Sequence, residues 1–221
     1  MSDTNAFASN SSLMGILTLR DIEFHRNENL LFSGIDASLE FGDILQIEGP
    51  NGSGKTTLLR LITMALSPCL GEITWQGENV TYIRERYLKN VLFLGHQPGL
   101  NESLSAEENL IWWRRLNKSN SLSDSDALKR TGLIKYKSIA CSHLSAGQVR
   151  RAALARLYVA EAKLWILDEP FSALDKEGSR ELKILILDHL SRGGIVVLST
   201  HHDLEIKNMK RISLVSSRQA C

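Results

Sequence analysis

The feature that most constrains the fold of this chain is a glycine-rich loop at residues 49–56, which reads GPNGSGKT. The loop matches the pattern G-x-x-x-x-G-K-[ST] without a mismatch, and it lies between the apolar stretches GDILQIE and TTLLRLITMAL. The first stretch predicts a buried strand and the second predicts a helix. Strand, loop and helix in this order form a phosphate cradle, in which successive backbone N–H groups face one anion at a helix N-terminus.

This loop predicts a binding site for ATP or GTP with Mg²⁺. Lys55 is expected to reach the β- and γ-phosphates, and the Thr56 hydroxyl is expected to ligate the metal ion. The residues expected to surround the phosphates are Gly49, Pro50, Asn51, Gly52, Ser53, Gly54, Lys55, Thr56 and Thr57.

The composition fits one large globular domain. The chain has 221 residues, 43% of them hydrophobic, and a net charge of +1, so nothing in its overall charge favours nucleic acid as a partner. No apolar run approaches the 18–20 residues that span a bilayer. Cys69, Cys141 and Cys221 are far apart, which favours neither a disulfide framework nor a zinc site.

The opening residues MSDTNAFASNSS resemble neither a signal peptide nor a transit peptide. We therefore predict a disordered tail over residues 1–13 and a single domain over 14–221.

Hydrophobic patterns predict an α/β core with a helical insertion. Strands are predicted at 16–24, 30–40, 43–48, 71–79, 91–95, 164–169 and 195–200, and a helix at about 176–190. Helical patterns dominate a segment of about 98–162, in which residues 105–117, 126–139 and 146–162 are helix-like and 117–126 reads as a loop. Ser105, followed by Glu108, is a candidate helix cap.

The run LWILDE at 164–169 places two acids at the end of an apolar strand. Carboxyl ends of parallel strands are where open α/β sheets bind ligands. Asp168 is then expected to hold Mg²⁺ through water, and Glu169 to act as the general base that polarises the attacking water. By itself the pattern equally fits any buried strand that ends in two surface acids.

A second anion site is predicted at LSAGQ, residues 144–148, which directly precedes an Ala- and Arg-rich helix. One nucleotide does not need two phosphate-binding helix starts in the same chain. Two chains arranged head-to-tail, each completing the other's site, would use both.

These motifs, in this order, resemble the ATP-binding subunits of ABC transporters over nearly the whole chain. The ordered elements are GPNGSGKT, Gln97, LSAGQ, LWILDEP, SALD and His201. The resemblance implies a P-loop NTPase fold of ABC type, with a mixed sheet core, an antiparallel β subdomain and an inserted α-helical subdomain.

The resemblance also implies roles for individual residues. Gln97 would sense Mg²⁺ and the attacking water, close to a membrane partner, and Asp175 of SALD would cross the dimer interface. His201 would contact the γ-phosphate, with a shift to the adjacent His202 left open. The signature residues expected to bind the γ-phosphate of the opposite subunit are Ser145, Gly147 and Gln148.

Two positions depart from the family pattern. Ala146 replaces a glycine that is frequent in the signature, a change expected to leave the anion site intact. The position where the family stacks an aromatic ring on adenine falls at Arg26, whose guanidinium can stack on a base. Phe24 is the aromatic residue close to this position, and it also fits a residue of the core. For Trp112 and Trp113, core packing and contact with a membrane subunit are both open.

Within the family, four stretches resemble the ATP-binding subunits of the bacterial haem exporters of cytochrome c maturation: ITWQGENV, FLGHQPGLNESLSAEENL, LWILDEPFSALD and GGIVVLSTHH. This resemblance implies a homodimer of ATPase subunits bound to multi-spanning membrane subunits, peripheral to the cytoplasmic face of the inner membrane. ATP hydrolysis would power haem delivery or release. No haem-ligand motif is present in the sequence, so direct haem binding is not expected.

Three alternatives stay open at this stage. They are an ABC subunit for another cargo such as a lipid, lipoprotein or drug, a soluble ABC protein of DNA repair or translation, and a scaffold that binds ATP and rarely hydrolyses it.

Overall fold

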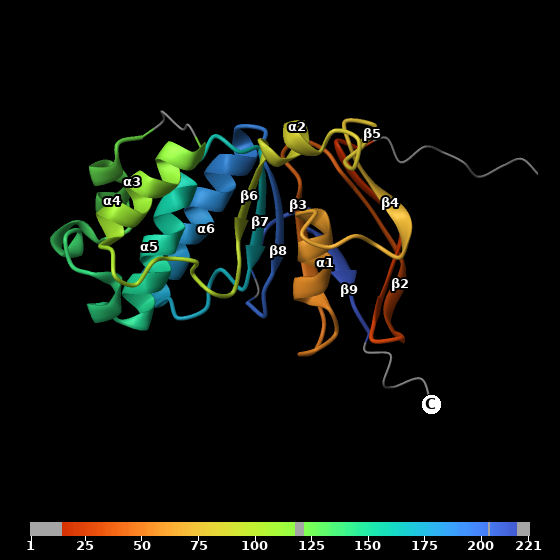
Figure 1. The fold of residues 1–221 in the computed structure, drawn as a ribbon, viewed down its shortest axis with the longest axis horizontal. Coiled ribbons are helices and arrows are strands. Elements are labelled where there is room, and N and C mark those ends of the chain that lie inside the picture. Colours follow the sequence, from red (N-terminus) through yellow and green to blue (C-terminus); the bar gives the residue numbers. More distant parts are fainter. Residues whose placement is uncertain (1–14, 118–121, 203, 216–221) are drawn as a thin grey trace, which may run out of the picture.

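Two β-sheets of different kinds lie side by side in this fold (Figure 1). The computed structural model describes residues 15–117, 122–202 and 204–215. The predicted tail at 1–13 and Cys221 lie outside the described residues.

The first sheet is antiparallel and has the strand order β2-β1-β4-β5. Its strands are β1 (Leu17–Arg26), β2 (Asn29–Leu39), β4 (Leu70–Trp75) and β5 (Glu78–Asn79). Leu17 and Leu19 of β1 are fully buried, as expected when alternate side chains of a strand face a core. This sheet is the predicted antiparallel β subdomain.

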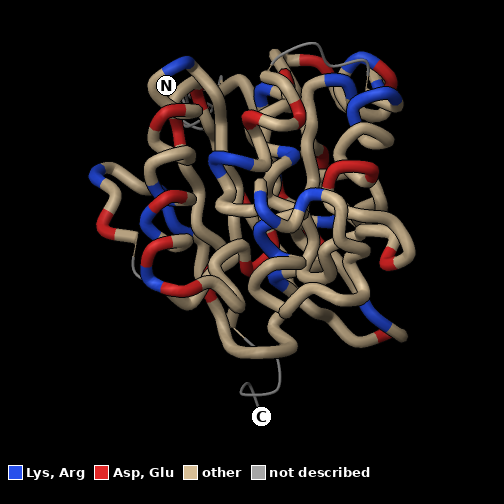
Figure 2. The backbone as a smooth tube through the Cα atoms, turned by 90° about the vertical axis from the view of Figure 1, so that its left-hand side faces the viewer, with Lys and Arg blue, Asp and Glu red and all other residues tan. Residues whose placement is uncertain are grey.

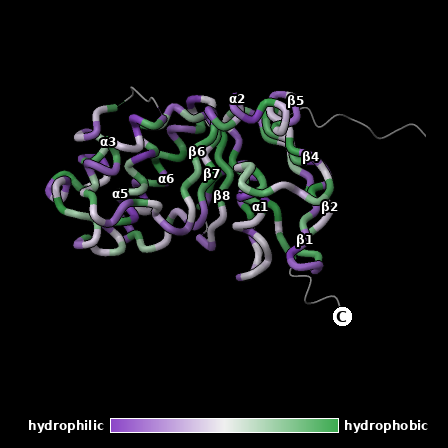
Figure 3. The backbone as a smooth tube through the Cα atoms, in the orientation of Figure 1, coloured by the Kyte–Doolittle hydropathy of each residue, from purple (hydrophilic) through white to green (hydrophobic). Residues whose placement is uncertain are grey.

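The second sheet is parallel throughout its described pairs and has the order β6-β7-β8-β3-β9. Its strands are β3 (Ile44–Glu48), β6 (Val91–Leu94), β7 (Leu164–Asp168), β8 (Ile195–Ser199) and β9 (Lys210–Ser213). All residues of β7 and β8 are buried, because helices or the other sheet cover both faces, and the strands are hydrophobic along their length in Figure 3. The carboxyl ends of these strands meet at one edge of the sheet.

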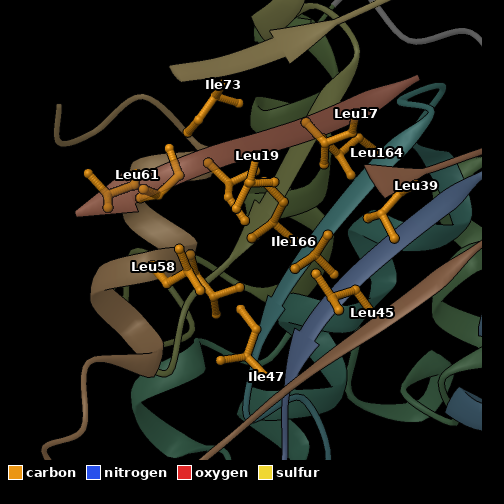
Figure 4. Packing of buried hydrophobic residues seen from close by; sticks show 14 of the residues in the cluster. Leu17, Leu19, Leu39, Leu45, Ile47, Leu58, Leu61, Ile73, Leu164 and Ile166 are labelled. Atoms are coloured by element: carbon orange, nitrogen blue, oxygen red, sulfur yellow. The ribbon is translucent and has the colours of Figure 1, made fainter. Parts of the chain in front are cut away.

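The two faces of the parallel sheet belong to different cores. Leu164 and Ile166 of β7 pack with the antiparallel sheet and with α1 (Lys55–Ile62), as Figure 4 shows. Trp165 and Leu167 point to the opposite face and pack against the side of α6 (Lys176–Ser191). The short helix α2 (Arg84–Leu88) precedes β6.

A group of helices flanks the face of the sheet that α6 covers (Figure 1). It contains α3 (Ala106–Asn117), α4 (Asp124–Arg130) and α5 (Ala146–Val159), with two 3₁₀ turns at Ile134–Tyr136 and Cys141–His143. These helices share a small core around Leu110, Leu128 and Ala155. The chain enters this group after β6 and leaves it before β7.

The predicted helix cap at Ser105 is confirmed, and Ser105 and Glu108 form two reciprocal hydrogen bonds. The Glu108 N–H donates to Ser105 Oγ at 3.2 Å, and the Ser105 N–H donates to a Glu108 carboxylate oxygen at 2.8 Å. This reciprocal pair supplies acceptors for two backbone N–H groups at the start of the helix.

Some predicted elements differ from the structure. The helix-like pattern at 126–139 holds only as far as Arg130, since Gly132 has φ +72 and turns the chain. The predicted loop at 117–126 already contains the first turn of α4, where the Ser123 side chain accepts a hydrogen bond from the Asp126 N–H at 3.1 Å. Residues 118–121 lie outside the described part of the chain.

The charged residues are spread over the fold. Figure 2 shows Lys and Arg segments interspersed with Asp and Glu segments, consistent with the nearly balanced sequence totals of 26 and 25. Among the described residues, none of the helices combines the length and the apolar composition that crossing a bilayer needs.

Candidate active site

The phosphate loop connects the end of β3 to the start of α1, as the sequence predicts. Gly54 caps α1 with φ 104, and a Cβ at this position would lie 2.8 Å from the Phe32 ring. Gly49 has φ 145, and a Cβ there would approach the Leu214 carbonyl oxygen to 2.5 Å. Both positions therefore exclude a side chain for conformational and steric reasons.

Lys55 lies inside the curve of the loop. Its Nζ donates to the carbonyl oxygens of Gly49 at 2.7 Å and Pro50 at 3.3 Å, and the residue is 8% exposed. The ammonium group is thus held at the loop, where it can exchange these neutral acceptors for phosphate oxygens.

A cavity of about 330 Å³ opens beside the loop. Its lining residues are Arg26, Asn51, Gly52, Gly54, Lys55, Thr56, Thr57, His96, Asp168 and Glu169. The cavity therefore joins the phosphate loop to the acids at the end of β7.

Arg26 reaches this cavity from the end of β1. One of its terminal nitrogens, Nη2, donates to Thr57 Oγ1 at 3.1 Å. Phe24 instead packs against the core through Phe32, with ring centroids 6.3 Å apart. The structure thus brings Arg26, and not Phe24, to the side of the phosphate loop.

Asp168 lies within hydrogen-bonding distance of the phosphate loop. Thr56 Oγ1 donates to its Oδ2 at 2.8 Å, and Ser199 Oγ donates to its Oδ1 at 2.6 Å. Asp168 is only 2% exposed. A hydroxyl and a carboxylate side by side are the oxygen donors that Mg²⁺ prefers in nucleotide sites.

Glu169 adopts the left-handed backbone conformation, with φ 46. Its N–H donates to the carbonyl oxygen and to the hydroxyl of Ser199, each at 3.1 Å. Among the described residues, its buried Oε1 accepts no hydrogen bond, while His201 Nε2 lies 3.4 Å away. A carboxylate oxygen with free lone pairs beside a phosphate loop can accept a proton.

The two adjacent histidines after β8 have different surroundings. His201 lies beside Glu169 and its side chain is 60% exposed. The His202 ring packs against Phe171, with centroids 5.7 Å apart, and the backbone N–H of His202 donates to Thr200 Oγ1. Of the two, His201 is the one brought to the carboxylate.

Gln97 does not line the cavity of the phosphate loop. It lines a separate cavity of about 560 Å³ whose other residues come from 98–102 and 141–149. Its neighbour His96 faces the phosphate loop in its place. The structure thus places Gln97 outside the cavity of the phosphate loop, and its contact with Mg²⁺ and the attacking water stays a prediction.

The signature segment also lies away from the cavity of its own chain. Ser145 caps α5 by accepting from the Gln148 N–H at 3.3 Å, and Gln148 Oε1 accepts from the Ser145 N–H at 2.9 Å. Gly147 packs closely enough that a Cβ would lie 3.0 Å from the Ala173 carbonyl oxygen. None of the three is among the residues that line the described cavity beside the phosphate loop.

Asp175 begins α6 and is engaged within its own chain. Its Oδ1 accepts from the Gly178 N–H at 2.8 Å and pairs with Arg151 Nη2 at 2.6 Å. These contacts lower the pKa of the carboxyl group, first through the Gly178 N–H and then through Arg151. The side chain remains 68% exposed.

Three residues of this region were not singled out from the sequence. Ser199 binds both Asp168 and Glu169, His96 lines the cavity, and Arg150 binds backbone carbonyls around it. The signal that could have pointed to Arg150 is weak, because it is one of three arginines in α5, with Arg151 and Arg156. Nothing comparable in the sequence marks Ser199.

The geometry agrees with what comparison to known proteins finds. The ABC transporter family matches residues 32–172. The chain is 44% identical over 209 residues to the cytochrome c biogenesis ATP-binding export protein CcmA of Escherichia coli K12, covering 94% of this chain and all of that protein. The Shigella flexneri protein of the same name is also 44% identical over 209 residues.

Solved structures show the same fold. An ATP-binding protein of a putative ABC transporter from Pyrococcus furiosus has a TM-score of 0.77 at 27% identity, over 90% of this chain and 96% of that one. A dimeric ATP-binding cassette in a post-hydrolysis state, bound to ADP and Pi, also has a TM-score of 0.77, at 22% identity over 91% and 97% of the two chains. The predicted P-loop fold of ABC type is confirmed, and this chain belongs to the ABC transporter family as an ATP-binding cassette with ATPase activity.

Proposed function

We propose that the chain is the ATP-hydrolysing subunit of a membrane complex that powers haem delivery or release in c-type cytochrome biogenesis. The observation that carries this proposal is the similarity to CcmA proteins, at 44% identity over their full length. The agreement extends beyond the motifs that all ABC cassettes share.

The residues around the phosphate loop fit ATP with Mg²⁺. Backbone N–H groups at the start of α1 and the Lys55 ammonium would bind the phosphates. Thr56 and Asp168 would hold Mg²⁺, directly and through water, because both present oxygen atoms at the same edge of the cavity. The ion would neutralise phosphate charge as the terminal P–O bond breaks.

Glu169 is the proposed general base. Water oxygen would form the new bond to the γ-phosphorus, the bond from phosphorus to the ADP oxygen would break, and Glu169 would take the water proton. His201, beside the same carboxylate, would contact the γ-phosphate. Arg26 would stack on the base or bind near the ribose, since it borders the phosphate loop.

The working unit in this proposal is a head-to-tail homodimer. Ser145, Gly147 and Gln148 would complete the site of the partner chain, which accounts for a signature segment that lies outside the cavity of its own chain. Asp175 would exchange or extend its contact with Arg151 to cross the interface. The region around Gln97 would contact multi-spanning membrane subunits, with the dimer peripheral to the cytoplasmic face of the inner membrane.

The proposal is tested in the source organism with Glu169→Gln introduced into this gene. A haem-peroxidase stain reports covalent c-type cytochromes, and b-type haem with general growth serves as the control. Loss of c-type haem alone supports the proposal. Normal c-type haem would assign the ATPase to another cargo, such as a lipid, lipoprotein or drug.

A further inference from the structure

One buried arginine joins the signature helix to the strand ends that carry the acids. Arg150 lies in the second turn of α5, two residues after LSAGQ, and is only 3% exposed. Burial lowers the pKa of its guanidinium, while the carboxylates of Asp168 and Glu169 raise it. A charge so well buried has to be compensated by hydrogen bonds or ion pairs.

The compensation comes from backbone carbonyls at two neighbouring strand ends. At the end of β7, Nη2 donates to the carbonyl oxygens of Asp168 at 3.1 Å and Glu169 at 2.7 Å, and Nε donates to that of Pro170 at 3.3 Å. After β6, Nη1 donates to the carbonyl oxygens of Gly95 at 3.0 Å and His96 at 3.5 Å. One planar guanidinium thus binds five carbonyl oxygens.

These bonds act on a residue that has a left-handed backbone conformation. Glu169 has φ 46, a backbone conformation that is uncommon for residues other than glycine and that surrounding contacts can stabilise. Its carbonyl oxygen is held by Arg150 and its N–H by Ser199. The peptide groups on both sides of Glu169 are therefore held, and with them the direction in which its side chain leaves the backbone.

We propose that Arg150 is a positioning residue, which holds Glu169 in its hydrolytic conformation and ties that conformation to the position of the signature helix. A displacement of α5 would pull on the Asp168–Pro170 carbonyls and on the segment that leads to Gln97 at the same time. The inference rests on the proposed role of Glu169 as general base.

The chain offers a matched control on the same helix. Arg156 is 9% exposed, has a pKa lowered by burial, and donates to the carbonyl oxygens of Pro98 at 3.3 Å and Gly99 at 2.6 Å. It is a buried cation bound to backbone carbonyls like Arg150, but it binds neither β7 nor Glu169 among the described contacts.

The experiment compares Arg150→Gln and Arg150→Lys with Arg156→Gln and Arg156→Lys in the full chain. The measurements are kcat and KM for ATP, affinity for a fluorescent ATP analogue, and the melting temperature. We expect Arg150→Gln to lower kcat by about 10- to 100-fold, the effect of misplacing a catalytic group, with KM and nucleotide affinity within about twofold. Arg150→Lys should be intermediate because one ammonium cannot replace a planar fork of donors.

The Arg156 variants should lower the melting temperature comparably but change kcat much less. An equal fall in kcat for both arginines, or an unchanged kcat in Arg150→Gln, would overturn the inference. The Lys variants keep the positive charge and the aliphatic part of the side chain. The kcat of Arg150→Lys can therefore be compared with that of Arg156→Lys if the Gln variants do not fold.

A double variant separates this inference from the function on which it rests. If Arg150 acts through Glu169, Arg150→Gln should slow the Glu169→Gln protein little further, and additive losses in the double variant would overturn the inference alone. Normal turnover of the single Glu169→Gln variant would overturn the role of Glu169 and the inference together.

Discussion

At the scale of single residues, the environment of Glu169 explains why one carboxylate at the strand end, and not its neighbour, is the proposed base. Both oxygens of Asp168 accept hydrogen bonds from hydroxyl groups. Oε1 of Glu169 accepts none among the described residues. Asp168 therefore suits the role of holding Mg²⁺, whereas Glu169 retains an oxygen that can accept a proton from water.

Replacing Glu169 with Gln removes the carboxylate that would accept the water proton and keeps the size and shape of the side chain. We expect ATP hydrolysis to fall by about 10²–10⁴-fold, the range for loss of one general base. ATP affinity should be retained, because the phosphate loop does not change. Steady-state turnover and equilibrium nucleotide binding measure the two quantities, and unchanged turnover would remove Glu169 from this role.

Lys55 makes the complementary residue-scale prediction. Lys55→Ala deletes the ammonium that lies inside the phosphate loop, so nucleotide binding itself should be lost, and not only turnover. Fluorescence titration with a labelled ATP analogue tests this, with Glu169→Gln as the binding-competent control. Normal affinity in Lys55→Ala would contradict the phosphate-cradle interpretation.

At the scale of elements, the prediction from sequence succeeded where a strand or helix has a strong periodic pattern. The buried strands β3, β7 and β8 and the long helix α6 carry such patterns, and they position the phosphate loop, Asp168 and Glu169. The phosphate loop and the two acids could therefore be placed from the sequence at one sheet edge.

The elements that the sequence did not predict are short or at an edge. The strand β9 has the polar sequence KRIS and pairs only with β3 at the sheet edge, so it lacks an apolar signal. Helix α2 has five residues, too few for a helical period. The separation of Gln97 from the phosphate-loop cavity could not be predicted either. It depends on the path of the chain after β6, which tertiary contacts determine and no local sequence pattern marks.

A stacked pair joins the C-terminal part of α6 to the parallel sheet and makes a prediction about pH. The ring of His189 lies parallel to that of Trp165, with centroids 3.7 Å apart, and a Cβ at Gly194 would collide with it at 2.1 Å. Burial lowers the pKa of His189 to about 4. The folded state therefore prefers the neutral ring.

Because the folded pKa of His189 lies below the unfolded value of about 6.5, its contribution to stability is fully present above that value. The contribution should decline as the pH falls from about 6.5 towards 4, by a total on the order of 3 kcal/mol. Urea unfolding at pH 7.5 and pH 5 measures the change in the free energy of unfolding. A His189→Gln variant should lose this part of the pH dependence, and the same slope in both proteins would contradict the assignment.

At the scale of the whole molecule, the separation of phosphate loop and signature segment has a functional consequence. In the proposed function, a second copy of the chain brings these two parts together, because they do not share a cavity within one chain. A closed two-fold arrangement would form two equal composite sites, each with the loop of one chain and the signature of the other. The proposed homodimer can be tested by combining defects.

Two inactive variants should restore activity when they are mixed. Lys55→Ala disables the phosphate loop and Ser145→Arg disables the signature, so each homodimer has two defective sites. In the mixed dimer, however, the intact loop of one chain faces the intact signature of the other. If half of the dimers are mixed and one of their two sites works, turnover should reach about a quarter of the wild-type value.

The matched control replaces the Lys55→Ala chain with a chain that carries both substitutions. Its mixed dimer with Ser145→Arg has no site with an intact loop and an intact signature, and it should stay inactive. Recovery in the first mixture alone requires that loop and signature act across two chains. A mixture as inactive as its components would mean that each chain completes its own site, and α5 would then have to move within the chain to bring Ser145 to the phosphate loop.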